Sequence, residues 1–460
     1  MQSFVILAAI VILAFVGFWM GNRRAIAQAG GWATRLHSLP FYHGFYVALW
    51  CGVPGLVLFL LWLVAGPQIL EAIVLAGLPP EYSNLPSAEL GLLKNEIRNL
   101  ANGDAIGTTA NAASQAAAEQ LVSLRRIAYA GLVVAVLAIA VAGLAFARGR
   151  IATAFRARNA VERAIMAMLI ICSTLSVLTT LGIVLSLLFE SLRFFERVPV
   201  TEFLFGLQWS PQTAIRDDQA GSSGAFGAVP LFVGTLLITM IAMAVAVPIG
   251  LLSAIYMADY ATPRVRAIAK PMLEVLAGIP TVVYGFFAAL TIAPFLRESG
   301  TFLGLDVASE SALAAGLVMG IMIIPFVSSL SDDVMNAVPQ SLRDASFALG
   351  ATKSETIRQV VFPAALPGIV GAVLLAISRA VGETMIVVMA AGLSANLTVN
   401  PLEAVSTVTV QIVTLLVGDQ EFDSAKTLAA FALGLVLFIA TLCLNIVALR
   451  VVRKYREKYD

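Results

Sequence analysis

The chain has 460 residues, of which 59% are hydrophobic and 12% are charged, and its mean hydropathy is +0.90. A soluble globular protein carries about twice this fraction of charged residues, so the composition excludes that class and indicates an integral membrane protein. The formal net charge is +1, and the two histidines, His37 and His43, offer almost no material for histidine-based catalysis. The three cysteines each lie in an apolar stretch and are not paired in a short motif, so neither a disulfide framework nor a metal site is indicated.

Nine stretches are apolar and long enough to cross a bilayer as helices, which takes about 20 residues each. They are 4–20, 45–66, 127–147, 164–189, 229–257, 272–296, 311–330, 364–391 and 427–449. The expected fold class is therefore an all-α integral membrane protein. The first stretch is expected to be a retained span, because Arg23 and Arg24 follow it and no basic residue precedes it, which is the reverse of a signal peptide.

Lysines and arginines collect in alternate loops of this pattern. With the N-terminus outside, 19 of the 29 fall in inner segments and Arg379 lies within a span. The inner segments are 21–44, 148–163, 258–271, 331–363 and 450–460. Because cytoplasmic loops are enriched in Lys and Arg, we expect a periplasmic N-terminus and a cytoplasmic C-terminus.

The basic loop 148–163 separates three spans from the six that follow, and the motifs described below all lie after it. We therefore expect an N-terminal extension, 1–163, with three transmembrane helices and a long periplasmic segment, and a six-helix core, 164–460. A single nine-helix bundle without a boundary is the alternative.

Prolines fall inside three consecutive expected spans of the core, at Pro248, Pro280 and Pro325. A proline in a membrane helix frees a backbone carbonyl, which is tolerated where the helix faces protein or a water-filled cavity. Three in succession favour a transport path, with simple packing kinks as the alternative. Thr281 and Tyr284, directly after Pro280, are expected as donors that line this path.

The loop 331–363 is predicted to form two short helices. Pro339 suits the first turn of a helix, and Gly350 can adopt the left-handed conformation that ends one. Thr352 and Glu355 have the spacing of a capping box, which predicts the start of a second helix that runs towards the end of the loop.

The first of these helices is expected to have two different faces. One face carries Leu342, Ala345 and Leu349. The other carries Arg343, Asp344 and Phe347. An aromatic side chain on a polar face suits insertion into a groove of a partner protein, although single exposed aromatic residues are also common.

This loop resembles the signature of bacterial ABC importer permeases. In that signature E-A-A is followed by three residues, G, nine residues and I-x-L-P; here D-A-S begins at Asp344, Gly350 follows at the family spacing, and V-V-F-P ends at Pro363. The resemblance implies a type I, MetI-like permease core with its transmembrane region at about 229–449. It also implies that the loop couples to a separate ATPase subunit. The coupling residues would be Asp344, Ala345, Phe347, Gly350 and Pro363.

The chain itself lacks the motif for ATP hydrolysis. G-A-T-K followed by Ser354 is not a Walker A loop, since that motif needs GxxxxGK[ST] and Lys353 follows Thr352. We therefore expect no ATPase site and no cofactor bound by this chain, with ATP and Mg²⁺ used by the partner ATPase. An ATP-independent channel is an alternative, whereas an intramembrane enzyme is disfavoured by the absence of HExxH and of G-x-S-x-G within a span.

Residues 234–261, 273–288 and 378–385 are together similar to phosphate importer permeases of the PstC type, and the similarity extends over roughly 165–450. It implies a second permease subunit of the PstA type, two ATPase subunits of the PstB type and a periplasmic phosphate-binding protein of the PstS type. It also implies a bacterial inner membrane location and no nucleic-acid partner. Permeases for sulfate, molybdate or phosphonate are the nearest alternatives.

The octapeptide SRAVGETM, 378–385, places Arg379 and Glu383 in an otherwise apolar stretch. Each charge at mid-bilayer costs about 2.5 to 3.5 kcal/mol, which indicates a function. A guanidinium matches a tetrahedral oxyanion, so Arg379 is expected to meet the transported anion. Glu383 is expected on the same helical face, where it would hold Arg379 or compete with the anion. Alternatively, the two neutralise each other, or Arg379 bridges to Glu274 or to the partner permease.

Overall fold

The computed structural model describes residues 2–30, 36–78, 87–103, 112–213, 223–417 and 424–455. Contacts between residues divide the chain into two compact units, Met1–Val177 and Leu178–Asp460. The division falls within helix α5 (Ala157–Phe195) and not in the basic loop before it. The first turns of α5 belong to the first unit because Val161 packs into a cluster with Ala25 and Val47.

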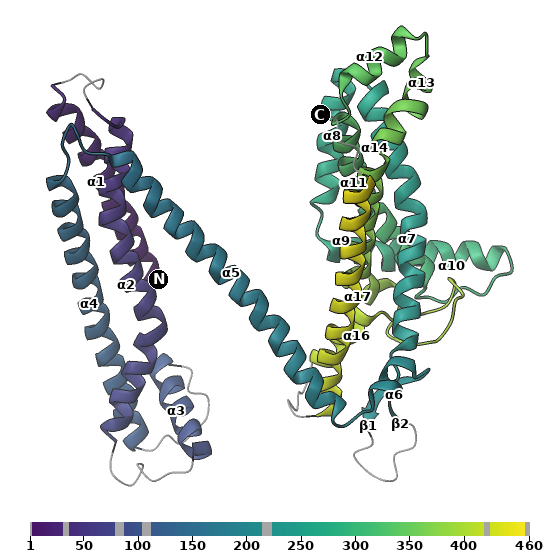
Figure 1. Cartoon of the computed structure of the whole chain (residues 1–460). Helices are drawn as coiled ribbons and strands as arrows, with labels where there is room; N and C mark the ends of the chain where they lie inside the picture. Colours follow the sequence, from purple (N-terminus) through teal and green to yellow (C-terminus); the bar gives the residue numbers. More distant parts are fainter. Residues whose placement is uncertain are drawn as a thin grey trace. The chain divides into compact units, whose positions relative to one another are not determined.

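Besides the start of α5, the described residues of the first unit form three long helices and one shorter one (Figure 1). They are α1 (Gln2–Gln28), α2 (Pro40–Ala76), α3 (Ser87–Asn102) and α4 (Ala112–Gly149). Glycines let the long helices approach closely, as is common between membrane helices. A side chain at Gly143 of α4 would collide with the Trp50 carbonyl of α2, and one at Gly44 of α2 would meet the Phe18 ring of α1 at 2.8 Å.

The second unit begins within α5 and continues through a series of helices broken by short π-helical turns, labelled η. They are α6 (Val200–Phe205), α7 (Val229–Ile255), η3 (Tyr256–Tyr260), α8 (Pro263–Ala277), α9 (Thr281–Phe287), η4 (Ala288–Ile292), α10 (Ala293–Phe302), α11 (Ala312–Asn336), α12 (Gln340–Ala348), α13 (Lys353–Thr356), η5 (Ile357–Val361), α14 (Phe362–Val381), α15 (Met385–Ala390), α16 (Val408–Leu416) and α17 (Ala425–Tyr455). Helices α12 and α13 lie at one end of this unit, and α6 lies at the other (Figure 1).

A two-stranded ribbon is the one departure from the expected all-helical fold within the described parts of the chain. Strand β1 (Trp209–Thr213) pairs antiparallel with β2 (Ser223–Phe226), so that Trp209 lies opposite Phe226. The Trp209 indole nitrogen donates to Oε1 of Gln411 on α16 at 3.0 Å. This hydrogen bond fixes the ribbon against the end of the helical core.

Helix α11 is the centre of the second unit, in contact with α7, α8, α9, α14 and α15. In its most apolar window 61% of the residues are buried. Gly316 and Gly320 face α7, where a side chain at either position would press against Ile241 or Val245. Small residues on α11 therefore allow the close helix contact on which this core depends.

Nine helices in the described chain are long and apolar enough to cross a membrane, by length and composition. Three of them end before residue 150 and six begin after it, which confirms the expected number and order. The protein is thus a multi-pass membrane protein with a mostly helical fold.

The sixth expected span, 272–296, is wrong in its bounds. Helix α8 ends at Ala277, and α9 begins at Thr281 after an extended Pro280 with φ −57° and ψ 137°. Proline lacks an N–H and cannot continue a helix without losing a hydrogen bond, so the chain breaks there. Pro248 and Pro325, in contrast, lie inside α7 and α11 as expected.

The eighth expected span, 364–391, is also displaced. The helical segment runs without interruption from Lys353 through η5 and α14 to Val381 and ends at Gly382. Pro363 lies in the first turn of α14 and therefore does not end the second loop helix. The second loop helix and the span that follows it therefore form one continuous helix.

Candidate functional site

A cavity of about 280 Å³ lies in the second unit between α8, α11 and α14. It has room for an oxyanion with several water molecules. Most of its wall is apolar, including Pro325 and Phe326 of α11. Its charged side chains are Lys270, Glu274, Asp332 and Arg379.

Arg379 reaches this cavity from the last turns of α14 and is exposed. Its guanidinium carbon lies 5.8 Å from the centre of the Phe326 ring. Within the described residues Arg379 has no hydrogen-bond or ion-pair partner. Its position at a helix C-terminus favours the cation, and its donors are available to a molecule in the cavity.

Glu383 does not share a helical face with Arg379, so that expectation is wrong. Helix α14 ends at Val381, and Glu383 follows in the turn before α15. Its Oε1 accepts hydrogen bonds from the backbone N–H groups of Thr384 and Met385, both at 3.1 Å. A carboxylate that satisfies free N–H groups at the start of a helix acts as a cap, and no pairing with Arg379 results.

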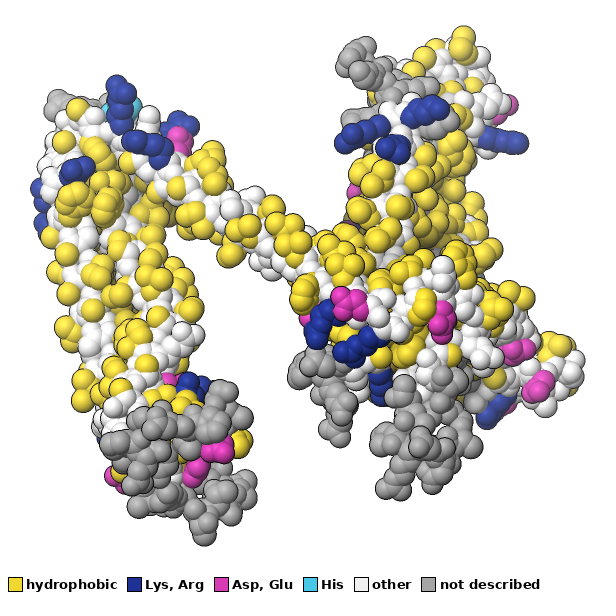
Figure 2. All heavy atoms as spheres, turned by 60° about the horizontal axis from the view of Figure 1, so that its bottom comes forward, with side chains coloured by type: hydrophobic (Ala, Val, Ile, Leu, Met, Phe, Trp, Pro, Cys, Tyr) yellow, Lys and Arg dark blue, Asp and Glu magenta, His cyan; other side chains and the backbone are white. Residues whose placement is uncertain are grey.

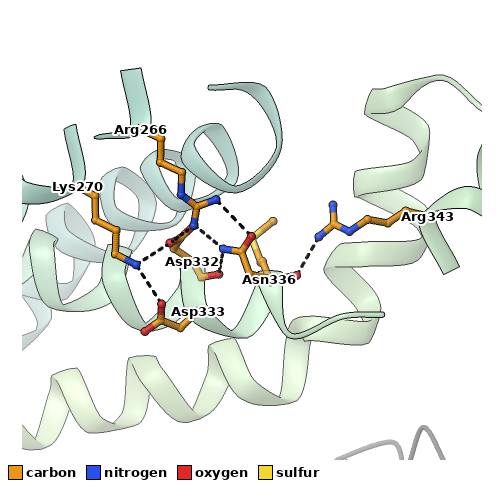
Figure 3. A network of polar contacts seen from close by, with 7 residues as sticks. Arg266, Lys270, Asp332, Asp333, Asn336 and Arg343 are labelled. Carbon is orange, nitrogen blue, oxygen red and sulfur yellow. Dashed lines mark hydrogen bonds and ion pairs between the residues drawn. The ribbon is translucent and has the colours of Figure 1, made fainter. Parts of the chain in front are cut away.

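A network of charged side chains joins α8 to α11 beside the cavity (Figure 3). Asp332 is fully buried, and its carboxylate accepts hydrogen bonds from Arg266 at 2.8 Å, Lys270 at 3.2 Å and Asn336 at 2.8 Å. Lys270 also pairs with Asp333 at 3.2 Å. Because a buried carboxylate is costly without such partners, Asp332 holds the two helices in one arrangement.

Lys270 is the second cation of the cavity wall, but it is already paired. Burial disfavours its ammonium form, yet its hydrogen bonds to Asp332 and Asp333 outweigh that effect and raise the pKa of Lys270 above its ordinary value. Lys270 therefore stays charged and bound to carboxylates at neutral pH. Arg379 is left as the unpaired cation among the described residues that line the cavity.

Helix α12 is oriented differently from the sequence prediction. Arg343, expected on the outer face, is buried and forms an ion pair with Asp259. It also donates to the Met335 carbonyl at 2.9 Å (Figure 3). Leu349, expected on the same face as Leu342, is 91% exposed. The buried Asp259 decides the orientation, because its charge needs a partner more than Leu349 needs burial.

The residues predicted to couple to an ATPase lie on the outer side of this end of the unit. They are Asp344, Ala345, Phe347, Gly350 and Pro363, all exposed. Phe347 is 44% exposed, as expected for an aromatic knob. The helix stop and the second helix start are confirmed: Gly350 has φ +85°, and the Thr352–Glu355 capping box is present.

Thr281 and Tyr284, expected along the path, do not line this cavity. Tyr284 is buried, and its hydroxyl donates to the Leu276 carbonyl at 2.9 Å, which ties α9 back to α8. Thr281 is half-buried at the start of α9. Glu274 does line the cavity, but it forms no ion pair with Arg379.

Sequence reasoning missed Arg266, Lys270 and Asp332 as members of the site. It ended the seventh span at residue 330, where the apolar pattern stops, and assigned Asp332 to the loop. The helix instead continues to Asn336, and the first proline or glycine after residue 330 is Pro339. Reading the span up to that proline would have placed Asp332 on the helix.

Two family models match the chain, one to each part. Residues 7–179 match a family described as phosphate ATP-binding cassette transporter. Residues 246–457 match the binding-protein-dependent transport system inner membrane component. With the six-span core, these matches define the class as the permeases of ABC importers.

Curated relatives narrow the class. The chain is 34% identical over 273 residues to a probable ABC transporter permease protein YqgH of Bacillus subtilis, covering 58% of this chain and 83% of the relative. It is 33% identical over 278 residues to the phosphate transport system permease protein PstC 1 of Mycobacterium tuberculosis, covering 55% and 81%. The permease protein PstA 1 of the same organism is 33% identical over 227 residues, covering 49% and 70%. The chain belongs to the PstC family of ABC importer permeases.

Proposed function

We propose that this chain is the transmembrane subunit of an ATP-driven importer that moves inorganic phosphate from the periplasm to the cytoplasm. Its family membership supports the importer class. The observation that carries the choice of an anion is the cavity in which Arg379 is unpaired while Lys270 is held by Asp332 and Asp333. A cavity with one uncommitted guanidinium is suited to an oxyanion.

Arg379 would meet the phosphate oxygens with its planar set of N–H donors. Two features of the cavity keep that binding weak enough for release. Glu274 lines the same space and repels an anion, and the apolar side chains that make up most of the wall offer it no hydrogen bonds. Transport requires this balance, since an anion bound too tightly would not leave.

Helix α12 would couple the permease to ATP hydrolysis by contacting the ATPase subunit. In the proposed topology the N-terminus is periplasmic and the C-terminus and α12 are cytoplasmic. Phe347 and Leu349 would seat in a groove of a PstB-type ATPase. Arg343 connects α12 to Asp259 and to the Met335 carbonyl of α11, and α11 carries Asp332 at the cavity, so a push on α12 would reach the cavity wall.

The complete importer would contain a second permease of the PstA type, two PstB-type ATPases and a PstS-type phosphate-binding protein. This chain would hydrolyse no ATP and bind no cofactor, while ATP and Mg²⁺ would be used by the ATPase subunits. The two permeases would form the pathway between them, and rocking of their packed helices would open it to each side in turn.

The test is uptake of radiolabelled phosphate by the complex reconstituted in vesicles. We expect uptake that needs ATP, the ATPase and the binding protein, and that excess unlabelled phosphate competes away. Stronger competition by sulfate, molybdate or a phosphonate would overturn the choice of phosphate. Uptake that continues with an ATPase unable to hydrolyse ATP would instead favour a channel.

A further inference from the structure

A second cavity, of about 480 Å³ and widely open to the surface, lies in the first unit, where the ends of α1 and α4 meet. It is lined by Trp19, Met20, Arg23, Arg24, Ala27 and Arg148. Half of these side chains are guanidinium groups, and none is a carboxylate. Such a set has a strong excess of positive charge inside one small space.

No described residue neutralises the arginines of this cavity. Arg23 stacks on the Trp19 ring with its guanidinium carbon 3.7 Å from the ring centre, which orients it without supplying a negative charge. Arg24 and Arg148 have no hydrogen-bond or ion-pair partner in the described chain. Elsewhere in the unit the contrast is clear, since Arg158 pairs with Glu162 at 2.6 Å. Mutual repulsion of the three cations favours an anion between them.

The cavity lies where the apolar surface of the membrane helices ends. Phe15 of α1 is 70% exposed and Val141 of α4 is 58% exposed, both on the membrane side of the arginines. Figure 2 shows Lys and Arg side chains gathered at one end of the first unit, next to a long hydrophobic surface. Trp19, half exposed between the two regions, is the residue type that marks a membrane interface.

We propose that this cavity binds the headgroup of an anionic phospholipid, with Arg23, Arg24 and Arg148 around the phosphate and the acyl chains along α1 and α4. Basic pockets between membrane helices are suited to such headgroups. Free inorganic phosphate shares the oxyanion chemistry, but it makes no use of the exposed apolar flank. The lipid would anchor the N-terminal unit at one membrane surface, independently of what the second unit transports.

The test is lipid binding to the full-length chain in detergent, followed by native mass spectrometry during titration with phosphatidylglycerol. We expect an Arg23→Gln, Arg24→Gln, Arg148→Gln variant to bind phosphatidylglycerol at least about tenfold more weakly. A matched variant, Arg156→Gln, Arg158→Gln, Arg163→Gln, removes the same charge from residues outside the cavity and is expected to bind within about threefold of the unmodified chain. Phosphatidylcholine is expected to bind both variants and the unmodified chain alike.

Other outcomes would overturn the proposal. An equal loss in the two triple variants would mean non-specific attraction to a basic surface. Displacement of the lipid by millimolar inorganic phosphate would mean a free-anion site. If the cavity variant does not fold, Ala27→Glu keeps all three arginines and adds a carboxylate to the cavity, so unchanged phosphatidylglycerol binding by that variant would also contradict the proposal.

Discussion

Two groups of cations in the second unit differ in one respect. Arg266, Lys270 and Arg343 are each paired with a buried carboxylate, Asp332 or Asp259. Among the described residues, Arg379 instead meets only the ring of Phe326. The paired cations connect α8, α11, α12 and η3, and their charges are already bound by carboxylates of the same chain. The unpaired one faces a cavity. The same kind of charge therefore serves structure in one place and is available to a ligand in the other.

This difference separates stability from transport. Removing a paired cation leaves a buried carboxylate without its partner, which is a folding penalty. Removing Arg379 leaves no such group, so the folded state loses little, and the loss should appear in transport. A paired-cation variant that lost transport but not stability, or an Arg379 variant that lost stability, would contradict this difference.

The largest expected effect is on the buried network. Arg266→Gln with Lys270→Gln leaves Asp332 buried with only Asn336, and we expect the free energy of unfolding to fall by about 3 to 5 kcal/mol. Adding Asp332→Asn removes the stranded charge and should recover most of that loss. Thermal unfolding of the purified chain in detergent measures both. A double variant as stable as the unmodified chain, or a triple variant no better than the double, would contradict the structural role.

Arg379→Gln is expected to lower phosphate uptake about 100-fold, since a hydrogen bond to a charged group contributes about 1.5 to 3 kcal/mol. Thermal stability and assembly with the partner subunits should be unchanged, and Arg379→Lys should retain part of the uptake because it keeps the charge without the fork of donors. Uptake is measured in reconstituted vesicles. Normal uptake by a correctly assembled Arg379→Gln complex would remove Arg379 from the pathway.

A smaller effect is expected on α12, where Arg343 is buried and Phe347 is exposed. Phe347→Ala should weaken binding of the ATPase about tenfold, as truncation of an interface aromatic commonly does, and leave thermal stability unchanged because the ring is 44% exposed. Arg343→Gln should instead lower stability by stranding Asp259. Copurification of the ATPase with each variant, beside thermal unfolding, distinguishes them. A loss of stability in Phe347→Ala would show that the ring packs against its own chain.

The smallest effect is expected at Glu383. Glu383→Gln keeps an acceptor oxygen for the Thr384 and Met385 N–H groups, so stability should fall by about 1 kcal/mol or less. Uptake should be nearly unchanged. A loss of uptake close to that of Arg379→Gln would revive the idea that Glu383 controls Arg379, against the cap seen in the structure.

Local chemistry in the sequence was enough for several features. The number and order of the nine spans follow from apolar length, the stop at Gly350 from its freedom to adopt a positive φ, and the Thr352–Glu355 cap from the spacing of two side chains. Each depends on residues a few positions apart, and each was predicted correctly. The exposure of Phe347 was also predicted correctly from the local sequence.

Other features depend on partners far away in the chain. Arg343 is buried because it pairs with Asp259, which is 84 residues away in the sequence. Asp332 pairs with Arg266 and Lys270, which are 66 and 62 residues away. Glu383 seemed a partner for Arg379 as long as the helix was taken to continue past Gly382. The sequence alone thus determined the membrane class, the number and order of the spans and the presence of a charge in the eighth span. Only the tertiary structure decided which cations are paired and that Arg379 has no partner in the described parts of the chain, because a charge takes the nearest partner in space and not in sequence.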